Sequence, residues 1–169
     1  MSMFKRYRRY PLKSKEATVL LKEASDKLKM DLCKVFGADV KVEHVDVDFG
    51  EIFLVNGVPA LFRSEGRVFP TLFFGEFVAS APKVVVDMGA VPRICNGADV
   101  MAPGIVRFEG TFDRGDLTVV VDERHGKPIA VGETAYSSDE ASRIKRGVIV
   151  KNVHFVGDKL WNALKTLRV

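Results

Sequence analysis

The chain has 169 residues, of which 47% are hydrophobic, and a net charge of +4 at pH 7. This hydrophobic content predicts one ordinary folded domain or two small ones, and it excludes a chain that is disordered throughout. The most apolar stretch is interrupted by a proline and a glutamate, so we expect no membrane-spanning helix. The opening residues lack the apolar segment of a signal peptide. We therefore expect a soluble cytoplasmic protein in which Cys33 and Cys95 are buried, reduced thiols.

The excess positive charge is concentrated at the start of the chain. Six basic residues and no acidic ones precede Glu16, whereas the remaining residues carry 20 basic and 22 acidic side chains. Basic residues interleaved with aromatic ones suit a polyanion whose bases can stack, so RNA is the expected ligand and a solvated tail is the alternative. The residues of this basic arm that we expect to contact RNA are Lys5, Arg6, Arg8 and Arg9.

The first half of the chain has the pattern of a small α+β unit that ends near Pro82. Apolar residues recur at helical spacing between Ser14, a suitable N-cap, and Gly37, a residue suited to end a helix. Alternating apolar and polar residues, or short apolar runs between turns containing glycine, then predict strands. The expected strands are VKVEHVDVDF, EIFLVNG, PALFRSEG and RVFPTLFF.

Beyond Pro82 short strands follow one another closely, which predicts a small barrel. We expect a brief helix that is capped by Asp87, has Pro92 in its first turn and ends before Gly97. Ser137 and Glu140 form a capping box for a second short helix, which Gly147 is expected to end. The expected strands are KVVVD, ADVMAPGI, VRFEGTF, DLTVVVDE, PIAVGETA and GVIVKNVHF.

Catalytic motifs are not recognisable in this sequence. Asp48-Phe49-Gly50 matches the magnesium motif of kinases, but no glycine-rich phosphate loop accompanies it. His44, Asp46 and Asp48 share one strand face at a spacing that could bind a metal, although a solvated polar face is the favoured interpretation. Neither cysteine and neither of the later histidines has the context of a catalytic triad. We therefore expect no catalytic residue, no metal and no cofactor.

The segment VPRICNGADVMAPGI, residues 91–105, is better suited to binding. Gly97 can adopt a positive φ, and its amide and that of Ala98 could donate to a phosphate. Arg93 could bind a phosphate with two hydrogen bonds or stack on a base. The alternative is an ordinary helix end followed by a strand, with an arginine on the surface.

Longer segments carry a family resemblance. GAVPRICNGADVMAPGI, GKPIAVGE and GVIVKNVHFVGDKLW resemble the PUA domain, an RNA-binding module named after pseudouridine synthase and archaeosine transglycosylase. FKRY, FLVNG, RVFPTL and KLW extend the likeness to the malignant-T-cell-amplified-sequence family. The resemblance implies an α+β pre-PUA domain over residues 1–82, followed by a mainly-β PUA pseudo-barrel over residues 83–169.

The resemblance also implies a function and a set of contacts. Family members are non-catalytic proteins of the translation machinery that bind tRNA, often its acceptor end, or rRNA at the small ribosomal subunit in initiation, reinitiation or recycling. Eukaryotic relatives pair with density-regulated protein, but nothing in this sequence shows such a partner. In related PUA domains RNA lies against the first helix, the turn after it and the last strand. Those positions here are Arg93, Asn96, Gly97, Ala98, Asp99, Lys151 and His154.

A local patch is needed for RNA binding by the second half. Residues 83–158 carry 10 basic and 11 acidic side chains, so overall charge cannot attract RNA there. We therefore add Arg143, Lys145 and Arg146 to the expected contacts. Two alternatives are an RNA-modification enzyme or its specificity subunit, for which residues 1–82 are too few to form a typical catalytic domain, and a protein scaffold that binds a partner through FPTLFF.

Overall fold

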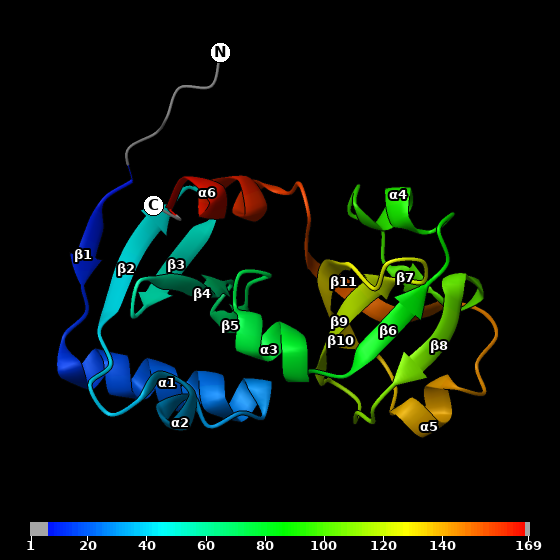
Figure 1. Ribbon diagram of the computed structural model, residues 1–169, viewed down its shortest axis with the longest axis horizontal. Coiled ribbons are helices and arrows are strands. Elements are labelled where there is room, and N and C mark those ends of the chain that lie inside the picture. The colour runs from blue at the N-terminus through cyan, green and yellow to red at the C-terminus, as the bar shows by residue number, and fades with distance from the viewer. Residues whose placement is uncertain (1–6, 168–169) are drawn as a thin grey trace, which may run out of the picture. The chain divides into compact units, whose positions relative to one another are not determined.

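The structure is a computed structural model that describes residues 7–167. The chain divides into two compact units, which are described separately here (Figure 1). The first unit comprises the residues up to Phe77 together with those from Leu164 onward, and the second comprises Val78–Ala163. The expected domain bounds, residues 1–82 for the pre-PUA domain and 83–169 for the PUA domain, remain a prediction.

The helical segment of the first unit consists of two helices, so the expectation of one continuous helix is wrong. The first helix, α1 (Ser14–Leu28), ends because Lys29 adopts the left-handed conformation with φ 54°. Asp31 then caps α2 (Leu32–Phe36), because its carboxylate accepts hydrogen bonds from the amides of Cys33 and Lys34. Gly37, with φ 86°, ends α2 as expected, but Ser14 is the first residue of α1 and is not its cap.

An antiparallel sheet completes the first unit, in the order β1-β2-β3-β4-β5 (Figure 1). The four expected strands and their glycine-containing turns are confirmed, but the last strand ends at Pro70 and does not include TLFF. A short helix, α3 (Gly75–Ser80), follows. Phe69 and Phe74 are buried in the core, which leaves the proposed FPTLFF scaffold surface without two of its aromatic rings. The strands are β1 (Arg9–Pro11), β2 (Val42–Val47), β3 (Gly50–Val55), β4 (Val58–Ser64) and β5 (Arg67–Pro70).

The polar face of β2 is less uniform than the alternating pattern suggests. Asp46 is exposed, as expected, and so is Asp48 in the turn after the strand. His44 instead is only 9% exposed, because its ring packs against the rings of Tyr10 and Phe53. The interpretation of these residues as a solvated face is therefore wrong for His44.

A curled six-stranded sheet forms the second unit, in the order β7-β11-β10-β9-β6-β8, which confirms the mainly-β PUA-type fold (Figure 1). Only β6 and β9 run parallel within this sheet, and all other neighbouring pairs are antiparallel. The strands are β6 (Lys83–Val86), β7 (Val100–Met101), β8 (Ile105–Glu109), β9 (Leu117–Asp122), β10 (Pro128–Thr134) and β11 (Val148–Phe155). The helices are α4 (Val91–Ile94), the 3₁₀ helix η1 (Ala102–Gly104), α5 (Ser138–Ala141) and α6 (Lys159–Leu167), the last of which continues into the first unit.

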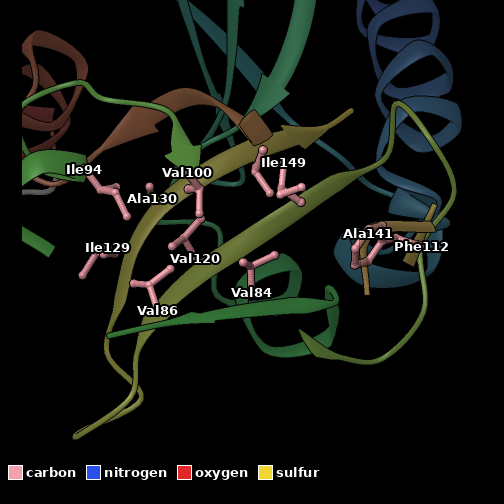
Figure 2. Close-up of a cluster of buried hydrophobic side chains, with 11 residues drawn as sticks. Val84, Val86, Ile94, Val100, Phe112, Val120, Ile129, Ala130, Ala141 and Ile149 are labelled. Carbon is pink, nitrogen blue, oxygen red and sulfur yellow. The ribbon is translucent and has the colours of Figure 1, made fainter. Parts of the chain in front are cut away.

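The core of the second unit fills the inside of the curled sheet (Figure 2). Val84, Val120 and Ile149 are completely buried there. Ile94 of α4 packs against the same cluster, so the short helix is fixed to the sheet by its apolar side. The opposite side of α4, which carries Arg93, remains exposed.

Several local expectations need correction. Ser137 caps α5 as expected, with its hydroxyl accepting from the amide of Glu140 at 3.2 Å, but α5 ends at Ala141, well before Gly147. Asp87 caps the turn that precedes α4, where its carboxylate accepts from the amide of Ala90 at 2.8 Å. The expectation of buried thiols is wrong for Cys33, which is exposed. None of the helices within residues 7–167 is long and apolar enough to cross a membrane.

Candidate nucleic-acid interface

The candidate interface is built around α4. Pro92 lies in the first turn of this helix, where its fixed φ favours the helical conformation and its missing amide costs no hydrogen bond. After the helix, the chain bends at Gly97, which has φ 98°. A left-handed φ of this kind suits glycine because it has no β-carbon. Gly97 and Ala98 are both exposed, so the bend lies on the surface of the second unit.

Two arginines from distant parts of the chain line one pocket beside this bend. The pocket has a volume of about 480 Å³ and contains Arg93 of α4 and Arg146, which precedes β11. The exposed residues Ala98, Met101 and Pro103 add apolar lining to the pocket. Such a pocket offers guanidinium groups to a phosphate and an apolar surface to a ribose or a base.

The acidic groups in the pocket are already held by hydrogen bonds within the protein. Asp87 accepts from the amide of Ala90, and Asp99 accepts from the amide of Asn152 at 2.8 Å. Within residues 7–167, by contrast, the structure records no ion pair for the side chains of Arg93 and Arg146. The two guanidinium groups are therefore available to an anion.

The main-chain amides of Gly97 and Ala98 are not free to bind a phosphate, contrary to the expectation from the sequence. The amide of Gly97 donates to the carbonyl oxygen of Ile94 at 3.0 Å, and that of Ala98 donates to the carbonyl oxygen of Arg93 at 3.0 Å. Both donors are satisfied by the end of α4. The proposed phosphate contacts of this segment therefore have to come from side chains.

Asn152 of β11 holds the bend in place, and sequence reasoning did not single it out. Its side-chain amide donates to the carbonyl oxygens of Ile94 at 3.0 Å and Ala98 at 2.9 Å. Asp99, which we expected to contact RNA, accepts the main-chain amide of the same residue. Both side chains position α4 and its bend against the sheet. No sequence signal marks this role, because the partners lie more than 50 residues away.

His154 is placed differently from its expected role. It is only 1% exposed, and its Nδ1 lies 2.9 Å from a carboxylate oxygen of Asp158. Burial raises the pKa of the Asp158 carboxyl, but the hydrogen bond and charge of His154, with the amides of Trp161 and Phe155, outweigh burial and lower it overall. His154 therefore supports the end of β11, and we leave it out of the proposed interface.

The remaining basic residues do not converge on the pocket. Arg143 of the α5 region forms an exposed ion pair of 3.0 Å with Asp139. Lys151 is exposed and lies opposite Glu133 in the pairing of β10 with β11, and Lys145 is exposed in the segment before β11. None of the three lines the pocket of Arg93 and Arg146.

The basic arm is described only in part. Lys5 and Arg6 lie outside the described residues, and Arg8 is exposed. Arg9 belongs to β1, where its guanidinium donates to the carboxylate of Glu43 at 2.6 Å. Arg9 therefore attaches β1 to β2, and its charge is partly neutralised.

Comparison with known protein families and solved structures supports the PUA-type fold described above. The family model of the PUA domain matches residues 82–156. A solved PUA-domain structure from Aeropyrum pernix K1, crystallised as a tartrate complex, covers 97% of this chain and 94% of its own with a TM-score of 0.79 and 29% identity.

Relatives at the sequence level cover most of the chain. An uncharacterised protein of Methanocaldococcus jannaschii is 44% identical over 72% of this chain and 75% of its own length. Translation machinery-associated protein 20 of Schizosaccharomyces pombe is 30% identical over 67% of this chain and 66% of its own. Malignant T-cell-amplified sequence 1-B of Xenopus laevis is 32% identical over 70% of this chain and 67% of its own. The chain therefore belongs to the malignant T-cell-amplified sequence family of PUA-domain proteins.

Proposed function

We propose that this protein is a non-catalytic RNA-binding protein of the translation machinery. The observation that carries the proposal is the pocket beside α4 that Arg93 and Arg146 line together with apolar residues. The PUA match over residues 82–156 supports RNA as the ligand, and the name of the Schizosaccharomyces pombe relative supports a role in translation.

The physical character of the pocket favours one chain end or a short single-stranded segment. Its volume of about 480 Å³ is that of a small-molecule site, large enough for a nucleotide and too small for a duplex. Guanidinium groups bind phosphates with two hydrogen bonds and stack on bases, whereas Met101, which is 46% exposed, offers contact to an apolar face. We propose that the pocket receives the acceptor end of tRNA or an unpaired segment of rRNA.

Membership of the family supports a proposal about the wider setting. We propose that the protein acts at the small ribosomal subunit in initiation, reinitiation or recycling, where it places or removes tRNA. A partner related to density-regulated protein belongs to the same proposal. Stoichiometric co-purification of such a partner from cells of the source organism would support it.

Binding to defined RNAs tests the proposal directly. Fluorescence anisotropy should compare intact tRNA, the same tRNA shortened at its 3′ end, and a fragment of small-subunit rRNA, each at several salt concentrations. We expect salt-dependent binding, with a loss of affinity for the shortened tRNA if the pocket holds the acceptor end. Equal affinity for intact and shortened tRNA would redirect the proposal to rRNA, and binding no tighter than that of a neutral control protein would refute it.

A further inference from the structure

A second cluster of chemically active side chains lies in the first unit, remote in sequence from the RNA pocket. His44 and Asp46 occupy alternate positions of β2, and Glu51 of β3 is the register partner of Asp46. The three side chains therefore share one face of the sheet. One ligand atom from each of them lies within 4.8 Å of the other two.

The imidazole of His44 faces the two carboxylates through Nε2. The residue is only 9% exposed, and its other ring nitrogen, the buried Nδ1, has no hydrogen-bond partner among the described residues. Nε2 lies 3.5 Å from an oxygen of Asp46 and 3.5 Å from an oxygen of Glu51. Both separations exceed the 2.7–2.9 Å or so that is typical of a charge-assisted hydrogen bond.

The two separations from Nε2 are close to those of atoms that share a metal ion, whereas the oxygens of Asp46 and Glu51, up to 4.8 Å apart, would have to approach each other to bind the same ion. Tetrahedral zinc, with bonds of about 2.0–2.2 Å to nitrogen and oxygen, holds its ligand atoms about 3.4 Å apart. A pocket of about 580 Å³, lined by His44 and Glu51, gives access from solvent and room for a water molecule as a further ligand. One imidazole nitrogen and two carboxylate oxygens form a donor set that binds divalent transition metals.

Neighbouring groups hold the carboxylates in place. The hydroxyl of Tyr10, on β1, donates to the second oxygen of Asp46 at 2.9 Å. Such a hydrogen bond orients a metal-binding carboxylate. Arg63 of β4 also faces the cluster, 3.8 Å from Glu51, but the same guanidinium makes two hydrogen bonds with Glu23, at 2.9 and 3.2 Å. Glu23 thus offsets part of the repulsion that Arg63 would exert on a cation.

We propose that His44, Asp46 and Glu51 form a binding site for a divalent transition-metal ion of the zinc class, and that Tyr10 is its positioning residue. The ion would join β2 to β3 and, through Tyr10, would fix β1 to the same face. This site is independent of the proposed RNA pocket, so either proposal can fail without the other.

Metal titration of the full chain tests the site. Protein freed of metal with a chelator should bind a single equivalent of Zn²⁺ in calorimetry, and Co²⁺ should give the visible absorption bands of a tetrahedral site with nitrogen and oxygen ligands. Glu51→Gln and Asp46→Asn keep the shape of the side chain and remove its charge. Each should weaken Zn²⁺ binding by at least about tenfold, since the loss of outer supporting groups already has effects of this size.

A matched control lies on the same strand. Glu43→Gln removes a carboxylate from the opposite side of β2, where Glu43 pairs with Arg9, and should leave Zn²⁺ affinity unchanged. Tyr10→Phe should weaken binding less than Glu51→Gln does. Circular dichroism checks that each variant is folded. Absence of saturable Zn²⁺ binding, or equal binding by wild type and Glu51→Gln, would overturn the proposal and leave an ion-paired cluster.

Discussion

The carboxylate of Asp99 accepts a hydrogen bond of 2.8 Å from the main-chain amide of Asn152, and this contact ties the bend after α4 to β11. The side chain of Asn152 adds two more hydrogen bonds, to the carbonyl oxygens of Ile94 and Ala98. The position of Arg93 therefore depends on a strand that is distant in sequence. Arg146 lies just before that same strand, β11. The positions of both arginines of the pocket therefore depend on β11.

Asn152→Ala should destabilise the protein by about 1–3 kcal/mol, because it removes the two hydrogen bonds that the side chain donates to the carbonyl oxygens of Ile94 and Ala98, each contributing about 0.5–1.5 kcal/mol. Urea unfolding measures the effect. Asn96→Ala is the matched control, since Asn96 is exposed on the same bend. A urea midpoint for Asn152→Ala within error of the midpoint for Asn96→Ala would show that the side-chain hydrogen bonds of Asn152 do not stabilise the fold.

Arg93→Glu and Arg146→Glu should each weaken RNA binding by about 1–3 kcal/mol, because each replaces a phosphate ligand with a charge that repels phosphate. The double variant should lose less than the sum of the two, since both residues line one pocket and would contact one ligand. The control is Arg124→Glu, an equal charge change at an exposed position outside the pocket. Losses no larger than that of the control would place the interface elsewhere.

Replacement of Lys5, Arg6 and Arg8 with glutamine should reduce the dependence of RNA affinity on salt. Each phosphate contact that is lost lowers the slope of log K against log salt concentration by about 0.7–0.9, because fewer counterions are released. The preference for one RNA over another should stay the same. Binding measured at several salt concentrations gives the slope for each variant.

The matched control for the basic arm changes the same amount of charge elsewhere in the first unit. It replaces three exposed lysines with glutamine: Lys22, Lys34 and Lys41. An equal change of slope in both triple variants would mean that total charge, and not the arm, governs the salt dependence.

Asp158→Asn should reduce the loss of stability in acid. Burial raises the pKa of the Asp158 carboxyl, but hydrogen bonds from His154 and two amides outweigh burial and lower it. A lowered folded-state pKa gives stability that is present above the unfolded value of about 3.9 and is lost as the pH falls through the folded value. Unfolding free energies measured from neutral pH down to about pH 3 should therefore fall more steeply in wild type than in Asp158→Asn.

The corresponding control for the acid range is Asp139→Asn, which removes an exposed carboxylate from the same unit. It should keep the steep wild-type profile. Parallel profiles for wild type and Asp158→Asn would show that the contact between Asp158 and His154 does not contribute to acid sensitivity.

Features with local causes could be predicted from the sequence. The turns at Asn56-Gly57 and Glu65-Gly66 have positive φ at each of these four residues, and the strands on either side follow directly from them. The capping hydroxyl of Ser137 acts within three residues. The break between α1 and α2 was missed, because Lys29 carries no composition signal for a left-handed conformation.

Features with distant causes could not be predicted in this way. The alternating pattern places His44 on a polar face, yet Tyr10 and Phe53 bury its ring. Glu51 joins the cluster through the register of β2 with β3, whereas the sequence pattern favours Asp48. The sequence indicates Arg146 only as one member of a basic patch. Its position in the pocket beside Arg93 depends on where β11 begins in the folded chain.

Crosslinking of bound RNA by ultraviolet light, followed by mass spectrometry of the attached peptides, tests the RNA-binding surface most directly. We predict crosslinks to tRNA or rRNA within residues 91–105 and in the peptide that contains Arg146. Crosslinks confined to the first unit, with no modified peptide from α4 or from the segment before β11, would contradict the assignment of this pocket to RNA.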